Sequence, residues 1–180
     1  MRISREHTAC LVIDIQERLV PVMHEKEALL KNCGILIEGL QALAIPMFVT
    51  QQYTKGLGGT VPEISSLIPD FSYFEKRDFS CIGEPEVMLQ LNMTGAKNLI
   101  VCGIESHVCV LQTVLDLKEN GFNPIVVTDA ISSRAPFSIE TAKERFRYEG
   151  VLMTSVESLL FELTRSSAAP EFKVISKLVK

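Results

Sequence analysis

The side chains that could carry chemistry stand directly after short apolar runs. Asp14, Gln51 and Asp129 each follow such a run. A carboxylate directly after a buried strand needs a partner, because an unpaired buried charge is costly. The pattern around Asp14 is equally compatible with a helix cap or a turn residue. Asp14 is therefore a candidate for acid–base chemistry, and a structural role stays open.

Cys109 is the thiol whose position is most informative. It ends the segment 103–109, which follows another apolar run. Ser106 is predicted to cap a helix and to place Cys109 in the first helical turn, where the helix dipole favours an anion and lowers a thiol pKa. Residues two apart on a helix do not face each other, so His107 is not its local partner. A reactive thiol and a small buried side chain both fit this position.

A sheet is needed to bring these residues together. Five apolar, β-branched runs predict strands, and they lie at residues 8–13, 46–50, 98–102, 124–128 and 151–153. Helical patterns lie at 28–43, 84–93, 106–120 and 138–148, with a further helix after Ser155. This alternation predicts one α/β domain over residues 1–180, with three layers (α/β/α) around a mostly parallel, Rossmann-like sheet. Ligands of such sheets bind at the carboxyl ends of the strands.

Composition narrows the classes of protein that remain. The chain has 180 residues, of which 47% are hydrophobic, so it can bury a sizeable core. With 18 basic and 22 acidic residues, a net charge of −4 and no Lys/Arg block longer than two, it lacks the charge pattern of a nucleic-acid binder. No apolar run approaches the ~18 residues of a membrane span. Five cysteines without a CxxC pair and a start without a signal-peptide pattern predict a cytoplasmic protein with free thiols.

Two segments predict contacts beyond a single chain. Residues 51–70 contain Gly56, Gly58, Gly59, Pro62 and Pro69 and are predicted to form a long irregular loop, a feature that is usually functional or interfacial. The amphipathic tail at residues 170–180 predicts a terminal helix. That tail either packs at a subunit interface or is solvated. The apolar surface of these segments predicts a homo-oligomer.

The ordered set of motifs resembles the isochorismatase-like cysteine hydrolases, a superfamily that includes nicotinamidases and carbamoylsarcosine amidohydrolases. The likeness runs from about Thr8 to the end of the chain and is nearest to the short isochorismatase-domain-containing proteins. It rests on LVIDIQ at 11–16, TQQY at 50–53, GLG at 56–58, TVPE at 60–63, EK at 75–76, FS at 79–80, CGIE at 102–105 with Cys109, DA at 129–130, SSR at 132–134 and PEFK at 170–173.

The resemblance implies a catalytic set of Asp14, Lys76 and Cys109. Lys76 beside the thiol would favour the thiolate, and Asp14 could accept the thiol proton. The oxyanion hole would be formed by backbone N–H groups of Glu105 and Cys109, with a cis peptide bond between Ile104 and Glu105. Candidates for substrate binding are Gln16, Gln51 and Tyr53.

The implied function is a cysteine-dependent hydrolase that cleaves an amide-type C–N bond of a small molecule through a thioester. Metal-binding nicotinamidases carry an acid and histidines after the second strand, whereas residues 51–55 here read QQYTK. We therefore expect no metal and no other cofactor, and the substrate stays open.

Two other functions fit the same sequence. A protein of this fold could bind or scaffold small molecules without turnover, although a packing role would not demand two opposite charges and a thiol together. A thiol redox protein could use Cys109 with Cys102 as resolving thiol, but Cys102 lies inside a predicted strand and no CxxC motif exists.

Overall fold

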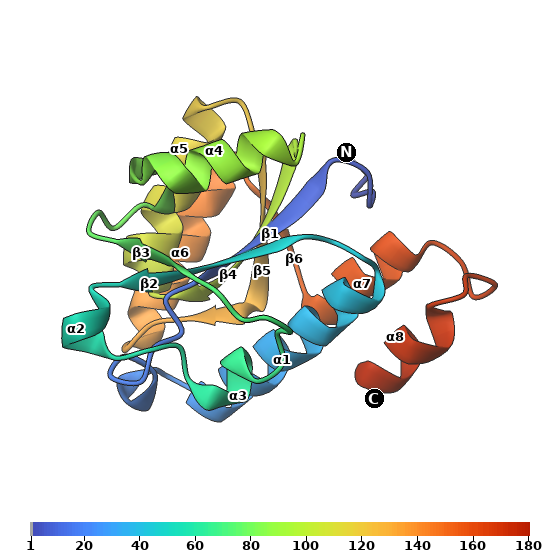
Figure 1. The fold of residues 1–180 in the computed structure, drawn as a ribbon, viewed down its shortest axis with the longest axis horizontal. Helices are drawn as coiled ribbons and strands as arrows, with labels where there is room; N and C mark the ends of the chain where they lie inside the picture. Colours follow the sequence, from blue (N-terminus) through green and yellow to red (C-terminus); the bar gives the residue numbers. More distant parts are fainter. Residues whose placement is uncertain (1) are drawn as a thin grey trace.

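Six parallel strands form the middle layer of the molecule (Figure 1). The structure is a computed structural model and describes residues 2–180. The strands are β1 (Thr8–Ile13), β2 (Met47–Gln52), β3 (Phe74–Lys76), β4 (Asn98–Ile104), β5 (Asn123–Ser132) and β6 (Leu152–Thr154). Their order in the sheet is β3-β2-β1-β4-β5-β6, so the direction of winding reverses between β1 and β4. Such a switch point is where open α/β sheets bind ligands.

Helices cover both faces of the sheet, which explains why the strands are apolar on both sides. One face packs against α1 (Lys26–Ala42), α7 (Val156–Thr164) and α8 (Phe172–Leu178). The other packs against α4 (Pro85–Met93), α5 (Leu111–Glu119) and α6 (Pro136–Tyr148). Every residue of β1 is buried, and alternate residues join different cores, Cys10 and Val12 on the α1 side and Leu11 and Ile13 on the α5 side. The predicted three-layer fold is confirmed, and its sheet is entirely parallel.

The predicted helices and their end signals are found close to their expected positions. A single-residue left-handed conformation at Gly121 and Gly150, with φ of 81° and 68°, follows α5 and α6. The Ser155 side chain accepts a hydrogen bond from the Ser158 amide and caps α7.

The predicted irregular loop was wrong in part. Residues 51–70 contain two short helices, α2 (Thr54–Leu57) and α3 (Pro62–Ser65), together with the end of β2. Pro62 occupies the first turn of α3, where its missing N–H costs nothing. The segment therefore has its own local structure, and it crosses from β2 to the edge strand β3 (Figure 1).

The C-terminal tail packs against its own chain. Ile175 of α8 is buried in the core with α1 and α7, and the rings of Phe161 and Phe172 lie 6.3 Å apart. Arg5 Nη1 forms an ion pair of 2.8 Å with Glu171 Oε1. The tail is therefore anchored through Ile175, and its place at a subunit interface stays a prediction.

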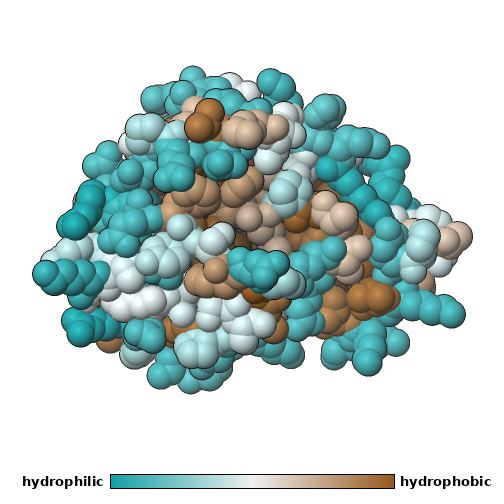
Figure 2. Space-filling model, in the orientation of Figure 1, coloured by the Kyte–Doolittle hydropathy of each residue, from teal (hydrophilic) through white to brown (hydrophobic). Residues whose placement is uncertain are grey.

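Apolar side chains also reach the surface. Figure 2 shows them gathered across the middle of one face and near α8, with polar side chains around them. Within residues 2–180, no helix has the length and apolar character needed to cross a bilayer.

Candidate active site

Asp14 and Lys76 form a fully buried ion pair at the carboxyl edge of the sheet. Asp14 directly follows β1 and has a left-handed conformation with φ of 52°, which aspartate tolerates better than most residues. Lys76 ends β3, two strands away, and its Nζ lies 2.7 Å from Asp14 Oδ2. Both side chains have 0% exposure. The structure thus brings together two residues that are 62 positions apart (76 − 14) in the sequence.

Opposing effects set the charge of this pair. Burial raises the pKa of Asp14, while the Lys76 ammonium and the Thr50 hydroxyl hold part of that increase back. Burial alone would lower the pKa of Lys76, but the Asp14 carboxylate and the Cys81 and Cys109 sulfurs raise it. The lysine is therefore cationic, and the carboxylate keeps an enhanced basicity, which suits a proton acceptor.

Cys109 lies in a π-helical turn, Ser106–Val110, that continues into α5. Glu105 is the cap residue of this turn and its side chain makes no capping bond, so the predicted cap at Ser106 was wrong by one position. The Ser106 hydroxyl is buried and has no hydrogen-bond partner among residues 2–180. π-helical turns inside α-helices occur frequently at functional sites.

The predicted low pKa of Cys109 was also wrong. Burial and the Asp14 carboxylate raise the pKa of the Cys109 thiol to about 12, and the opposing effect of Lys76 is smaller. Cys109 is buried with 7% exposure, and its raised pKa means that it carries its proton at neutral pH. The arrangement favours a neutral thiol next to a carboxylate that can accept its proton as a bond forms.

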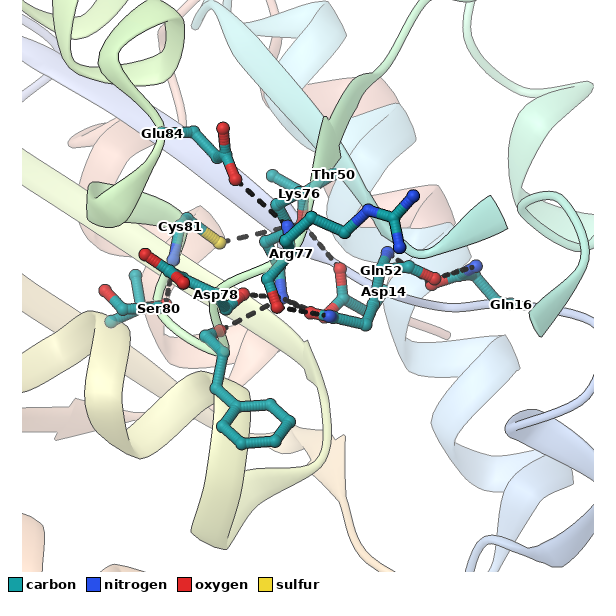
Figure 3. A network of polar contacts seen from close by, with 12 residues as sticks. Asp14, Gln16, Thr50, Gln52, Lys76, Arg77, Asp78, Ser80, Cys81 and Glu84 are labelled. Carbon is teal, nitrogen blue, oxygen red and sulfur yellow. Dashed lines mark hydrogen bonds and ion pairs between the residues drawn. The ribbon is translucent and has the colours of Figure 1, made fainter. Parts of the chain in front are cut away.

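The Lys76 ammonium is surrounded by protein acceptors. Besides Asp14, it contacts Gln52 Oε1 at 2.6 Å and the carbonyl oxygens of Phe79 and Asp78 at 3.0 and 3.2 Å (Figure 3). Gln52 and the two carbonyl oxygens account for its three N–H bonds, so the contact with Asp14 is an ion pair.

Two residues that sequence reasoning missed complete the site. Thr50 Oγ1 donates to Asp14 Oδ1 at 2.8 Å, and Gln52 contacts Lys76 as described. Alternate residues of a strand point to the same face, so positions 50 and 52 share a face that position 51 does not. Gln51, the predicted substrate contact, instead donates to Thr60 Oγ1 at 3.0 Å and accepts from Thr54 Oγ1 at 2.8 Å. The two-residue period of β2 is the signal that could have identified Thr50 and Gln52.

The other two substrate-binding candidates differ in their surroundings. Gln16 is fully buried; its Nε2 donates to the carbonyl oxygens of Gln52 and Gly58, and its Oε1 accepts from the Gln52 amide. Tyr53 is 39% exposed, and the Arg77 guanidinium lies 4.5 Å from the centre of its ring. Gln16 therefore holds the backbone of the site, whereas Tyr53 remains accessible to a ligand.

The segment before Cys109 has the expected backbone and its own side-chain contacts. The Ile104–Glu105 peptide bond is cis, as the resemblance implied. Glu105 Oε2 accepts from Arg134 Nε at 3.1 Å, and His107 Nδ1 lies 2.9 Å from Ser133 Oγ. His107 is thus oriented toward the end of β5. This orientation agrees with the sequence argument that His107 does not pair with Cys109.

The remaining thiols separate into two groups. Cys81 Sγ lies 3.6 Å from Thr50 Oγ1, on the Cys109 side of the sheet. Cys10, Cys33 and Cys102 are fully buried in the core on the α1 side. Cys102 therefore faces away from Cys109, and the hypothesis that it serves as resolving thiol finds no support.

Asp129, the third residue singled out at a strand end, lies outside this cluster. Its Oδ1 accepts from the Val156 amide at 2.9 Å, at the start of α7. It also lines a cavity of about 220 Å³ between α1 and α6.

Within residues 2–180, no three His, Cys, Asp or Glu side chains are grouped in a way that could hold a metal ion.

Comparison with known proteins places the chain in a family. The model of the isochorismatase domain matches residues 8–158. The "Secreted isochorismatase effector Isc1" of Phytophthora sojae is 39% identical over 183 aligned positions, which cover 99% of this chain and 87% of that protein. A solved structure described as the MAR1 ribonuclease from Caenorhabditis elegans is 36% identical, with a TM-score of 0.94 over 99% of this chain and 92% of the other.

A more distant solved structure confirms the fold. The YcaC gene product from Escherichia coli, described as an octameric hydrolase of unknown specificity, has a TM-score of 0.92 and 24% identity, covering 99% of this chain and 89% of the other. The six-stranded parallel sheet and its helical layers agree with these comparisons. Because the family model spans most of the sequence, the chain belongs to the isochorismatase family of hydrolases.

Proposed function

We propose that the protein hydrolyses an amide-type C–N bond of a small molecule, with Cys109 as nucleophile, Asp14 as base and Lys76 as counter-ion. The observation that carries the proposal is the buried Asp14–Lys76 pair next to the protonated Cys109 thiol. Burying two opposite charges is costly and contributes little to stability. A catalytic role gives a reason for that cost.

The reaction has two steps. The Cys109 sulfur bonds to the carbonyl carbon while its proton passes to Asp14; the C–N bond then breaks, and the nitrogen leaves with that proton as a free amine. In the second step, Asp14 takes a proton from water, whose oxygen attacks the thioester carbon. The C–S bond breaks, the sulfur recovers the proton, and the carboxylic acid leaves.

Negative charge on the substrate oxygen is stabilised by backbone N–H groups. The proposed donors are the amides of Glu105 and Cys109, because the latter lies in the first turn of a helix that runs from Ser106 to Glu119. The positive end of the helix dipole supports an anion there. Donors fixed before the reaction are the most effective.

Lys76 acts through Asp14 and transfers no proton in this scheme. Its N–H bonds are directed at Gln52 and two carbonyl oxygens, and its charge lies 2.7 Å from Asp14 Oδ2. A fixed positive charge keeps the buried carboxylate ionised and therefore able to accept the thiol proton.

RNA is a less suitable substrate, although one similar structure is described as a ribonuclease. The chain has a net charge of −4 and no Lys/Arg block longer than two. Binding to a phosphate backbone depends on clustered basic side chains. Non-catalytic binding of a small molecule is the other alternative, and turnover distinguishes it.

The test is a panel of small primary and secondary amides, with release of ammonia or amine as readout. The proposal predicts turnover and a covalent acyl adduct on Cys109, seen by mass spectrometry of quenched reactions. Cys109→Ala should lose both, whereas Cys102→Ala, altered on the opposite side of the sheet, should keep both. Cleavage of RNA that survives in Cys109→Ala, or turnover of an amide without an adduct in the presence of Cys109, would overturn the proposal.

A homo-oligomer and a cytoplasmic location stay predictions. One structural relative is described as octameric. Phe137 and Tyr148 of α6 are 81% and 86% exposed, which is unusual for aromatic side chains and fits a contact between subunits. A light-scattering mass near 20.0 kDa at micromolar concentration would contradict oligomerisation.

A further inference from the structure

We propose that Thr50 and Gln52 are positioning residues that divide the work of the buried pair: Thr50 holds Asp14 as an oriented base, and Gln52 holds Lys76 as a fixed counter-ion. We call these two side chains the β2 clamp. The inference rests on the proposed function, because it assigns Asp14 and Lys76 their roles there. It adds two residues that contact the base and its counter-ion.

The location of the β2 clamp follows from the order of the strands. Asp14 follows β1 and Lys76 ends β3, while β2 lies between those two strands. Thr50 pairs with Ile13 on one side and Phe74 on the other, and Gln52 pairs with Lys76. Positions 50 and 52 share a face of the strand. One strand can therefore reach each member of the ion pair with a separate side chain.

Thr50 completes the surroundings of the carboxylate. Its single hydroxyl proton goes to Asp14 Oδ1 at 2.8 Å, so the thiol of Cys81, 3.6 Å away, is left as a donor to Thr50 Oγ1. Asp14 Oδ2 forms an ion pair with Lys76 and has no hydrogen-bond partner among residues 2–180. Thr50 thus occupies one oxygen, and the second remains the acceptor for the Cys109 proton.

Gln52 is itself held at both ends of its amide and at its backbone. Its Oε1 accepts from Lys76 Nζ at 2.6 Å, and its Nε2 donates to the Arg77 carbonyl oxygen at 2.7 Å. The backbone amide of Gln52 donates to Gln16 Oε1 at 2.7 Å. Figure 3 shows Gln52 between Gln16 and the Lys76–Asp14 pair. Any other orientation of the Gln52 side-chain amide would break at least one of these contacts. The amide therefore holds the Lys76 ammonium in a fixed place.

The groups that act on Asp14 come from several elements. Lys76 comes from β3, Cys109 from the π-helical turn and Cys81 from the short turn between β3 and α4. Of these, only Lys76 is charged at neutral pH, because the pKa values of Cys81 and Cys109 are raised to about 11 and about 12. A shift in the titration of Asp14 therefore reports on Lys76 and on hydrogen bonds to the carboxylate.

The experiment measures the pH dependence of Cys109 alkylation by iodoacetamide in the full-length protein, which requires no substrate. Below the pKa of Asp14 the carboxyl is protonated, the thiol loses its proton acceptor, and the rate falls. Thr50→Val removes a donor to the ionised carboxylate, so the midpoint of this fall should move to higher pH by about one unit, a tenfold change in the protonation equilibrium. Thr50→Ser keeps the hydroxyl and should restore the wild-type midpoint. Thr50→Ala replaces Thr50→Val if the latter does not fold.

Gln52→Leu tests the other half of the β2 clamp. Loss of one acceptor loosens the ammonium, so the same midpoint should rise, by less than in Thr50→Val because Asp14 and the two carbonyl oxygens still hold Lys76. Two matched controls lie elsewhere. Thr128→Val removes a hydroxyl that donates to the Thr154 carbonyl oxygen, and Gln41→Leu removes an amide that donates to the Leu67 carbonyl oxygen. Neither control should move the midpoint.

The Asp14→Asn variant distinguishes failure of this inference from failure of the proposed function. If Asp14→Asn abolishes the acidic midpoint and Thr50→Val leaves it in place, the β2 clamp is refuted and the base assignment stands. A Thr50→Ser midpoint shifted as far as that of Thr50→Val refutes the hydroxyl contact in particular. If Asp14→Asn keeps the wild-type profile, the proposed role of Asp14 falls as well.

Discussion

The two faces of one sheet hold two groups of buried thiols with different neighbours. On the α1 side, Cys10, Cys33 and Cys102 lie among aliphatic side chains, and the contacts of Cys33 and Cys102 are to the carbonyl oxygens of Ala130 and Leu11 at 3.4 and 3.7 Å. On the α5 side, Cys81 and Cys109 lie next to a buried ion pair. The same residue type, similarly buried, thus has two different electrostatic surroundings.

This comparison separates burial from activation. Hydrogen bonding to Cys102 and burial raise the pKa of Cys10 and Cys33, and burial also raises the pKa of Cys81 and Cys109. Hydrogen bonding with Cys10 and Cys33 lowers the pKa of Cys102 to about 5, so the thiol pKa neither separates the two groups nor identifies the nucleophile. The Asp14 carboxylate acts on both Cys81 and Cys109, but Cys109 keeps an exposure of 7% whereas Cys81 has 0%. In the proposed mechanism, the reactivity of Cys109 depends on a proton acceptor.

The largest expected effects come from removing the nucleophile, the proton acceptor or its counter-ion. Cys109→Ala, Asp14→Asn and Lys76→Met should each lower amide hydrolysis by about 10³-fold or more, and the double variant Asp14→Asn/Lys76→Met should lose no more than either single variant, since the residues share one step. Lys76→Met should also cost about 3–5 kcal/mol of unfolding free energy, because it leaves a buried carboxylate without its partner.

The uncharged double variant separates stability from activity. It should recover most of the unfolding free energy in urea titrations and none of the hydrolysis. Independent, multiplying losses of activity among the three positions would contradict a shared step.

The next largest effect is a shift in the pKa of the Cys109 thiol, and the charge of Asp14 sets its sign. The Asp14 carboxylate raises the pKa of the Cys109 thiol, so Asp14→Asn should lower the midpoint of direct thiolate formation from about 12. Thiolate absorbance in the ultraviolet during alkaline titration, with Cys109→Ala subtracted as reference, measures it. An unchanged or higher midpoint would show that the carboxylate does not act on this thiol.

Changes on the other face should affect stability alone. Cys102→Ala removes a fully buried sulfur from the α1-side core and should cost about 1–2 kcal/mol of unfolding free energy. The rate of Cys109 alkylation at equal temperature should remain that of the wild type. A tenfold slower alkylation in a folded Cys102→Ala protein would couple the two thiol groups and weaken the comparison.

The smallest expected effect is that of a chelator. Gln51 and Gln52 occupy the segment whose sequence predicts no metal, and both side chains are hydrogen-bonded within the protein. Activity after incubation with EDTA and gel filtration should equal that before. Stoichiometric zinc, iron or manganese in elemental analysis, with loss of activity on its removal, would contradict this.

Much of this site was predictable from one sequence, for reasons visible in particular residues. β1 has the predicted bounds, and Asp14 was found because the ends of parallel strands meet at one edge. Lys76 required the family resemblance, since β3 has only three residues and carries little pattern of its own. Thr50 and Gln52 were missed because the sequence analysis selected the polar residue that directly follows each apolar run, which is Gln51 here. Side-chain alternation along a strand decides which face each residue points to, and Thr50 and Gln52 share the face of the ion pair. The high pKa of Cys109 could not be foreseen, because it depends on how far the fold buries the thiol.

The central claim is that Cys109, among five thiols, is the one that the site activates. Its direct test is brief treatment of the native protein with iodoacetamide at near-neutral pH, followed by peptide mapping by mass spectrometry. The account predicts that Cys109 is carbamidomethylated first. It also predicts that Asp14→Asn slows this labelling at the same pH, because the thiol stays protonated near neutral pH in both proteins and reacts by proton transfer to Asp14. Earlier labelling of Cys81 or of any thiol in the α1-side core, or equal rates in wild type and Asp14→Asn, would contradict it.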